Sequence, residues 1–301
     1  MIEVQSLCKT FQGKTPQAIN AVDNLSFQIH KQETFGLLGP NGAGKTTTIS
    51  MITGILKPDS GSIMIGGIED PSVADSRRTI GIAPQSLALY DNLTADENLV
   101  FFARLYGLPN KLLRERVDWA LEFAGLTDRR RGRVHTFSGG MQRRLNLAAA
   151  LVHDPQVILL DEPTVGVDPQ SRNHIFASIE QLKAEGRTIV YTTHYMEEAQ
   201  RLCDRVAIMD HGKILDVDTI EALIDRHGGR SVVKAQLQRP PDEDVRLPAA
   251  LDGLSLRFET EQPLEDIGQL SSLGVAFHTL EVARPDLETV FLTLTGRSLR
   301  D

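Results

Sequence analysis

The sequence predicts an α/β domain around a largely parallel sheet, followed by a small α+β module. Over most of the chain, strand-like runs alternate with helix-like periodic segments, which is typical of a sheet covered by helices. Residues 157–160 are continuously apolar, as expected for a strand buried on both faces, and we place them at the centre of the sheet. Near Gly228-Gly229 the alternation ends. With 301 residues, 41% of them apolar, the chain is long enough for two domains.

The expected strands of the larger domain are short runs rich in β-branched and other apolar residues. Helix-like segments separate most of them, and apolar residues recur with helical spacing at 99–106 and 141–152. The strand-like runs are residues 26–29, 34–38, 62–65, 80–83, 157–160, 188–192 and 205–209.

Residues 39–46 form a complete phosphate loop between the strand at 34–38 and an expected helix at 47–56, which Lys57-Pro58 closes. The pattern G-x-x-x-x-G-K-[ST] lets consecutive backbone N–H groups turn toward phosphate oxygens, while the lysine adds a cation and the threonine offers a hydroxyl to Mg²⁺. The start of the helix adds the positive end of its dipole. The sequence therefore predicts that a nucleoside triphosphate binds at Gly39, Pro40, Asn41, Gly42, Ala43, Gly44, Lys45, Thr46 and Thr47.

A pair of carboxylates, Asp161 and Glu162, follows the apolar strand at 157–160. Neighbouring residues at a strand end point in different directions, so one can reach the Mg²⁺ shell while the other faces the attacking water. We assign Asp161 to the metal, largely through water, and Glu162 to the role of general base. An isolated pair of this kind would as readily cap a strand in a solvated turn, and the phosphate loop favours the catalytic interpretation.

The tripeptide Ser138-Gly139-Gly140 opens the helix that is expected to run to residue 152. Serine is a good helix cap, and the two glycines expose the first backbone amides at a positive helix end, which makes a second anion site. Taken alone, the same tripeptide is a common linker fragment. The chain thus carries two phosphate-binding helix starts but one phosphate loop.

Beyond Gly228-Gly229 the long periodic runs disappear and several prolines follow. Residues 232–237, 254–258 and 275–280 look like strands, and residues 285–295 look like a helix with one apolar face. We therefore expect a nucleotide-binding domain at 1–228 and a small accessory domain at 229–301.

Composition and charge exclude several classes of protein. No apolar run approaches the ~18 residues that cross a bilayer, and the first residues do not resemble a secretory signal, so we expect a cytoplasmic chain. The net charge of −8 offers no basic stripe, so nucleic acid is not an expected partner, although local patches remain open. Cys8 and Cys203 lack metal-type spacing and are expected to be reduced packing residues, with a disulfide left open.

Further residues complete an ordered set with the phosphate loop: Gln85, the tripeptide at 138–140, the Asp161-Glu162 pair, Asp168 and His194. In order and approximate spacing, this set resembles the nucleotide-binding subunit of ATP-binding cassette (ABC) transporters over about residues 2–225. The resemblance implies a P-loop NTPase fold with a RecA-like core, an antiparallel β subdomain and a helical subdomain that carries residues 138–140, the signature. It also implies ATP and Mg²⁺ as ligands, and two domains paired head to tail so that each signature closes over the partner's ATP.

The resemblance assigns roles to residues that local pattern alone leaves unremarkable. Phe11 resembles the aromatic residue that stacks on adenine, a role that needs only a ring face. Gln85 looks like the glutamine that senses Mg²⁺ and the attacking water while its loop meets the membrane partner. His194 resembles the histidine that contacts the γ-phosphate, and Asp168 the aspartate that communicates across the dimer interface. On their own, Phe11 and His194 would be interpreted as core and structural residues.

The signature departs from the commonest family form at two positions. Phe137 stands where leucine is usual, and Met141 stands where glutamine is usual. Gln142 does not replace that glutamine, because one residue moves about 100° around a helix. We expect the cradle of backbone amides to survive, and a side-chain contact from position 141 is left open.

The C-terminal run at 285–296 resembles the terminal segment of bacterial exporter ATPases that partner with ABC-2-type permeases, many of which move drugs, polyketides or lipids. Met141, Arg143-Arg144 and the run at 194–199 point to the same subgroup. The resemblance implies an ATPase at the inner face of the membrane. It would dimerise on ATP binding, with a second copy or a paralogue, and power export through a separate permease.

The rival function is a soluble ABC-type ATPase that acts as a nucleic-acid- or ribosome-linked switch. Such relatives usually carry two cassettes or a long coiled-coil insertion, whereas this chain has one phosphate loop and no such insertion. A third possibility, an inactive nucleotide-binding scaffold, is disfavoured because Lys45, Glu162 and His194 are all present.

Overall fold

The computed structural model describes residues 2–12, 18–242 and 245–296. The chain divides into two compact units, residues 1–220 and 221–301, and each is described by itself. This division falls at the start of helix α8 (Ile220–His227), whereas the boundary expected at Gly228-Gly229 follows that helix. The functional extent of each domain stays a prediction.

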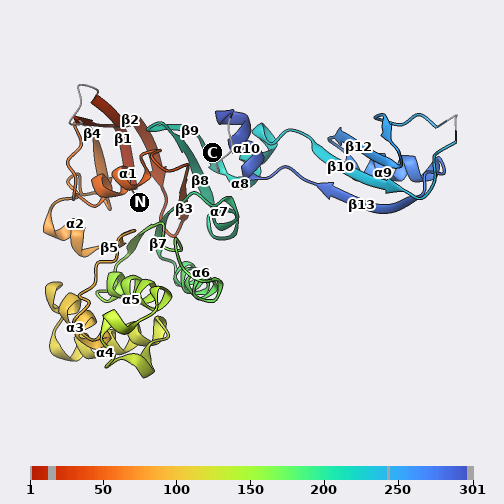
Figure 1. The fold of residues 1–301 in the computed structure, drawn as a ribbon. Helices are drawn as coiled ribbons and strands as arrows, with labels where there is room; N and C mark the ends of the chain where they lie inside the picture. Colours follow the sequence, from red (N-terminus) through yellow and green to blue (C-terminus); the bar gives the residue numbers. More distant parts are fainter. Residues whose placement is uncertain (1, 13–17, 243–244, 297–301) are drawn as a thin grey trace. The chain divides into compact units, whose positions relative to one another are not determined.

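Unit 1 is built around a six-stranded sheet with the strand order β5-β6-β7-β3-β8-β9 (Figure 1). All neighbouring pairs are parallel except β8 and β9, which form an antiparallel pair at one edge. The predicted α/β class with a largely parallel sheet is therefore confirmed. In the order of the sheet, the strands are β5 (Ile80–Ala83), β6 (Val157–Asp161), β7 (Thr188–Thr193), β3 (Thr34–Leu38), β8 (Arg205–Asp210) and β9 (Lys213–Thr219).

Three interior strands, β3, β6 and β7, are buried at every position, which explains their continuous apolar character. Strand β6 was expected at the centre of the sheet, but it lies next to the edge strand β5, and β7 and β3 are more central. The parallel register pairs Leu38 with Thr193 and Asp161 with Thr192. The carboxyl ends of these strands therefore meet at one edge, where open α/β sheets bind ligands.

An antiparallel sheet with the order β2-β1-β4 forms the second layer of unit 1. Its strands are β1 (Ile2–Gln12), β2 (Ala18–Ile29) and β4 (Ser60–Ile65), and their apolar side chains share one core with helix α1 (Lys45–Ile52). The antiparallel β subdomain implied by the resemblance is present. Strand β1 escaped the sequence analysis because register shifts after Val4 and a left-handed residue, Ser6, interrupt its alternation.

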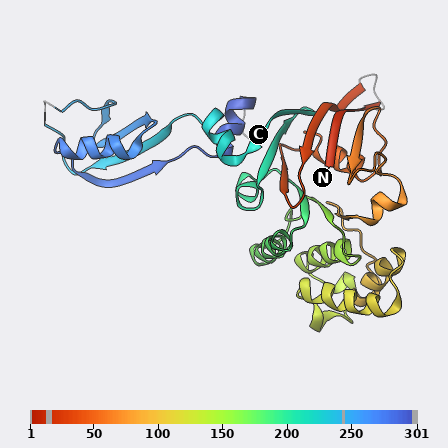
Figure 2. The ribbon, with the colours of Figure 1, turned by 180° about the vertical axis from the view of Figure 1, so that it is seen from behind.

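A separate group of helices, α3 (Ala95–Leu105), α4 (Asn110–Phe123) and α5 (Gly139–Leu151), encloses its own apolar cluster. Figures 1 and 2 show these helices together at one end of unit 1, away from β1, β2 and β4. Helix α3 begins with a capping box in which Thr94 and Glu97 satisfy each other's backbone N–H groups. The other helices of unit 1 are α2 (Ala74–Arg78), α6 (Pro169–Ala184) and α7 (Met196–Leu202), with 3₁₀ turns at Thr127–Arg129 and Val134–Thr136.

Helix α1 ends earlier than the sequence suggested. It was expected to reach residue 56, but it stops at Ile52 with Thr53 as its C-cap. Gly54 follows with φ of 69°, and a Cβ on it would lie 2.7 Å from backbone atoms of Ser72. The left-handed glycine, and not the later proline, therefore ends the helix.

Unit 2 contains a four-stranded antiparallel sheet with the order β11-β12-β10-β13. Buried side chains alternate along β10 and β12 and share a core with α9, in agreement with the expected α+β module. The third expected strand, 275–280, is displaced to Phe277–Ala283. The elements are β10 (Ser231–Leu237), β11 (Leu251–Asp252), β12 (Ser255–Thr260), α9 (Pro263–Ser272), β13 (Phe277–Ala283) and α10 (Leu287–Thr295).

The described part of the chain holds no helix with the length and apolar character needed to cross a bilayer. Cys8 and Cys203 are both free thiols, and Cys203 is buried.

The helical cluster offers a direct test of packing, because the only tryptophan of the chain, Trp119, packs against it. Leu121 on the same helix is fully buried, so Leu121→Ala should lower the free energy of unfolding by about 2–5 kcal/mol. Leu112, also on α4, is 44% exposed. Leu112→Ala should change the free energy of unfolding by less than about 0.5 kcal/mol. Urea titration followed by Trp119 fluorescence measures both, and equal losses would contradict the described core.

Candidate functional site

The phosphate loop is shaped by close backbone approaches. A Cβ at Gly39 would lie 2.3 Å from the carbonyl oxygen of Met209, and a Cβ at Gly44 would lie 2.3 Å from that of Ala21, with φ at Gly44 of 101°. Neither position accepts a side chain without displacing the backbone. Helix α1 starts at Gly44 without a side-chain cap, so its first N–H groups are available to phosphate oxygens.

The side chain of Lys45 is buried at the start of α1, with 5% exposure. Its ammonium donates to the carbonyl oxygens of Gly39 at 2.7 Å and Pro40 at 3.0 Å, and it lies 3.2 Å from Glu162 Oε1. Burial lowers the pKa of Lys45, and the negative charges of Glu162 and Asp161 oppose that shift. The loop thus holds the Lys45 ammonium against two of its own carbonyl oxygens and next to Glu162.

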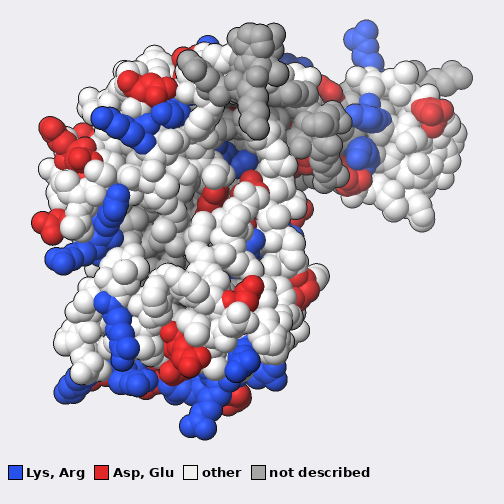
Figure 3. Space-filling view, turned by 60° about the vertical axis from the view of Figure 1, so that its left-hand side comes forward, with Lys and Arg blue, Asp and Glu red and all other residues white. Residues whose placement is uncertain are grey.

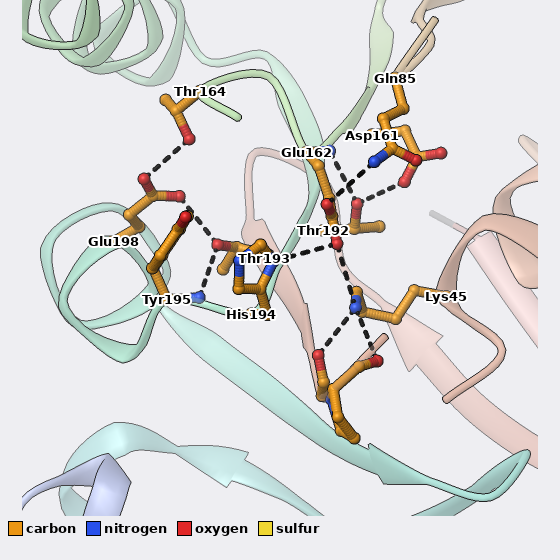
Figure 4. A network of polar contacts seen from close by, with 12 residues as sticks. Lys45, Gln85, Asp161, Glu162, Thr164, Thr192, Thr193, His194, Tyr195 and Glu198 are labelled. Carbon is orange, nitrogen blue, oxygen red and sulfur yellow. Dashed lines mark hydrogen bonds and ion pairs between the residues drawn. The ribbon is translucent and has the colours of Figure 1, made fainter. Parts of the chain in front are cut away.

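Glu162 is the point at which the predicted catalytic residues meet. Gln85 Nε2 donates to Glu162 Oε2 at 3.2 Å, and His194 Nδ1 lies 3.3 Å from Glu162 Oε1. Figure 4 shows Lys45, Gln85 and His194 converging on this carboxylate from three separate segments. The carboxylate is 5% exposed, and this set of partners offsets the cost of burying its charge. The structure therefore brings together Lys45, Gln85, Glu162 and His194.

Thr192, which the sequence analysis did not single out, fixes the two carboxylates relative to each other. Its hydroxyl donates to Asp161 Oδ1 at 2.6 Å and accepts from the backbone N–H of Glu162 at 3.0 Å. Glu162 has a left-handed backbone with φ of 46°, a conformation uncommon outside glycine. In the sequence, the signal that could have identified Thr192 is the change from apolar to polar residues at the end of strand β7.

A second buried carboxylate, Glu198, holds the segments that flank the site. It accepts hydrogen bonds from Thr164 at 2.7 Å, from Tyr191 and Thr193 at 2.8 Å, and from Arg172 at 3.1 Å. Burial and the adjacent Glu198 raise the pKa of Tyr191 well above its usual value, so the phenol stays a donor. The loops after β6 and β7 are thereby fixed to one point. In the sequence, residues 194–199 indicate the exporter subgroup and assign no role to Glu198.

The two glycines of the signature differ in their surroundings. Ser138 caps α5 by accepting from the N–H of Met141 at 3.3 Å. Gly139 is exposed and a Cβ there would meet nothing within 4 Å, whereas a Cβ at Gly140 would lie 2.0 Å from Ser171 Oγ. Ser138 and Gly139 therefore present the helix start to solvent, while Gly140 packs it against α6.

Asp168 caps helix α6. Its carboxylate accepts from the N–H of Ser171 at 2.9 Å and from the Ser171 hydroxyl at 2.8 Å. These bonds lower the pKa of Asp168. The residue expected to communicate across a dimer interface is thus engaged within its own chain, directly beside Gly140.

The signature and the phosphate loop belong to different parts of unit 1. Helix α1 contributes to the core of the two sheets, and α5 contributes to the helical cluster. Among the described residues, no hydrogen bond joins Ser138 or Gly139 to the phosphate loop.

Phe11 lies near the end of β1 and is 41% exposed. The ammonium of Lys9 lies 5.9 Å from the centre of its ring. The residue is therefore exposed and not part of the core.

The oxygen atoms near the phosphate loop suit a hard cation. They include the exposed hydroxyl of Thr46, the carboxylate of Asp161 and the amide of Gln85. Where the structure describes the chain, no three His, Cys, Asp or Glu side chains form a metal-binding group. This sparse oxygen set fits Mg²⁺, which binds one or two protein groups together with substrate phosphates and water.

Comparison with known sequences and structures agrees with this geometry. Residues 22–165 match the family described as ABC transporter. The chain is 43% identical, over an alignment 318 positions long that covers all of both proteins, to the linearmycin resistance ATP-binding protein LnrL of Bacillus subtilis (strain 168). It is 40% identical to the Nod factor export ATP-binding protein I of Rhizobium sp. (strain N33), covering 99% of this chain and 98% of that protein.

Solved structures show the same fold. The dimeric, post-hydrolysis ATP-binding cassette MJ0796 bound to ADP and Pi superposes with a TM-score of 0.67 and 27% identity, covering 73% of this chain and 98% of the cassette. An ATP-binding subunit of an ABC transporter gives a TM-score of 0.66 with 31% identity, covering 75% and 93%.

The different surroundings of the two signature glycines predict different costs of adding a methyl group. Gly140→Ala should lower the free energy of unfolding by about 1–3 kcal/mol, because its Cβ overlaps Ser171. Gly139→Ala should change it by less than about 1 kcal/mol. Urea unfolding of both variants, followed by Trp119 fluorescence, makes the comparison; an equally stable Gly140→Ala variant would show that α5 and α6 are not packed as described.

Proposed function

This chain belongs to the ABC transporter family of ATP-binding proteins, and on that premise we propose that it is the ATP-hydrolysing subunit of an exporter, which dimerises on binding ATP and drives a separate ABC-2-type permease. The observation that carries this proposal is the convergence of Lys45, Gln85 and His194 on Glu162. The relatives named for linearmycin resistance and Nod factor export support the assignment to export.

The chemistry proposed for the site follows from its contacts. Mg²⁺ held by Thr46 and Asp161 would supply charge neutralisation for phosphoryl transfer. Lys45 and His194 both contact Glu162 Oε1, and when both turn toward the phosphates that oxygen would be free to accept the proton of the attacking water. Gln85, which donates to the other carboxylate oxygen, Glu162 Oε2, would orient the water. His194 would contact the γ-phosphate. These roles require the four side chains to act as one unit.

Dimerisation accounts for the second anion site. Ser138 and Gly139 are exposed at the start of α5, where free N–H groups and the helix dipole favour phosphate. The phosphate loop of the same chain lies in another part of unit 1. The MJ0796 cassette, which has the same fold, is described as dimeric. We therefore infer that the signature receives the nucleotide bound by a second subunit.

An exposed apolar surface follows Gln85 and supports a permease contact. Leu87, Tyr90, Phe101 and Leu105 are 40%, 49%, 40% and 70% exposed. The rings of Tyr90 and Phe101 meet edge to face with their centres 4.9 Å apart. Exposed apolar patches of this kind mark protein interaction sites, and Leu87 comes two residues after Gln85, the residue that contacts Glu162.

Basic side chains are also exposed on the helical part of unit 1, and Arg104 lies beside Phe101 and Leu105. In Figure 3, Lys and Arg gather along the lower edge, over the helical part of unit 1, with acidic residues between them. The exposed basic residues of this part are Arg104, Lys111, Arg114, Arg129, Arg131 and Arg133. Such a local patch is compatible with the anionic inner leaflet, and it supports a peripheral location on the cytoplasmic side, at the permease.

The first test concerns closure of the dimer. Glu162→Gln keeps the shape of the side chain but removes the proton acceptor, so the ATP-bound dimer should accumulate. Light scattering after gel filtration in saturating Mg-ATP should show a dimer for Glu162→Gln and a monomer for the double variant Lys45→Ala/Glu162→Gln. A monomeric Glu162→Gln variant that still binds ATP would contradict the dimer proposal.

The second test concerns the triphosphate. Lys45→Ala removes a buried ammonium from the phosphate loop, so the Kd for ATP should rise roughly 10- to 100-fold, as expected for a lost charge-assisted hydrogen bond. Lys57, an exposed lysine beyond the end of α1, provides the control, and Lys57→Ala should bind ATP like the parent. Titration with a fluorescent ATP analogue measures both, and near-normal binding by Lys45→Ala would remove Lys45 from this role.

A further inference from the structure

Arg143 is a buried cation in the second turn of the signature helix α5, with 9% exposure. Its guanidinium donates to backbone oxygens of two loops that are distant in sequence. Nη1 lies 2.7 Å from the carbonyl oxygen of Gln85 and 3.3 Å from that of Pro84, and Nη2 lies 3.4 Å from that of Val165. One side chain thus joins the signature helix, the loop that presents Gln85 and the loop that follows Glu162.

Because the charge of Arg143 is buried, it depends on the hydrogen bonds to these carbonyl oxygens. Among the described residues, no carboxylate lies within ion-pair distance of Arg143, so the carbonyl oxygens are the groups that replace water around it. Burial lowers the pKa of Arg143, and the charges of Asp161 and Glu162 oppose that shift. A neutral or shorter side chain would leave the carbonyl oxygens of both loops without this donor.

Two buried asparagines hold the rest of the same loop. Asn146 of α5 accepts from the N–H of Ala88 at 3.0 Å, and Asn98 of α3 accepts from the N–H of Tyr90 at 2.8 Å and donates to its carbonyl oxygen at 3.1 Å. The loop is therefore attached to helices at several points between residues 84 and 90. Arg143 supplies the attachment at Gln85 itself.

We propose that Arg143 is a positioning residue, which sets the Gln85 amide against Glu162 and ties it to the helix that carries the signature. The inference rests on the role proposed above for Gln85. Because residues 138–140 begin the helix that carries Arg143, this guanidinium, together with Asn146 of the same helix, joins the loop at Gln85 to the signature.

The test compares two arginines that donate to backbone carbonyl oxygens: Arg143, from α5 to the loop at Gln85, and Arg116, from α4 to the end of α5. Arg143→Gln should lower kcat for ATP hydrolysis roughly 10- to 100-fold, the range expected when a catalytic group is displaced by about 1 Å, with KM for ATP nearly unchanged. Arg116 caps the opposite end of α5 through the carbonyl oxygens of Leu151 and Val152 at 2.8 and 3.1 Å, and Arg116→Gln should retain kcat within about twofold. Arg143→Lys, which keeps the charge but has a single donor nitrogen, should give an intermediate kcat. Thermal unfolding of each variant separates loss of fold from loss of turnover.

A double-mutant cycle tests whether Arg143 acts through Gln85. In a Gln85→Ala background, Arg143→Gln should cause little further loss of kcat, because the side chain that it positions is absent. Losses that multiply, or equal kcat in Arg143→Gln and Arg116→Gln, would overturn the inference. If Gln85→Ala itself retained full kcat, the role proposed for Gln85 would fail instead, so the two failures are distinguishable.

Discussion

One buried carboxylate, Glu162, sets the constraint on which unit 1 depends. A charge with 5% exposure is tolerated only where donors surround it. Those donors come from the helix after β3, the loop after β5 and the loop after β7. Parallel pairing of β6 with β5 and β7, and of β7 with β3, brings these segments to one edge of the sheet. The parallel topology of the sheet therefore brings together the donors that the buried carboxylate of Glu162 requires.

The strongest sequence predictions concerned features that are local in the chain. The phosphate loop, the strand before it and the apolar strand before Asp161 each occupy a few consecutive residues, and their position in the fold follows from backbone geometry. The alternating strands of unit 2 were also visible, because α9 covers one face of their sheet. Strand β1 was missed because bulges remove the alternation that identifies a strand.

The contacts that position the catalytic groups could not be predicted, because they join residues far apart in sequence. Arg143 and Gln85 are 58 residues apart, and Thr164 and Glu198 are 34 residues apart. No local period or motif encodes such a pair. The signature glycines show the same limit, since adjacent and chemically identical residues have opposite surroundings once α6 packs against one of them. The sequence named the residues that we propose to react, whereas only the folded chain shows the contacts that hold them in place.

The exposed ring of Phe11 bears on which nucleotide this protein binds. A phenyl ring offers a face to a base but no donor or acceptor that could distinguish the edges of adenine from those of guanine. If Phe11 receives the base, as the family resemblance implies, recognition at this position depends on stacking, which all nucleobases share. Preference for ATP over GTP at β1 would then follow the relative abundance of the two nucleotides in the cell, and the identity of the base would matter less to this subunit than the triphosphate attached to it.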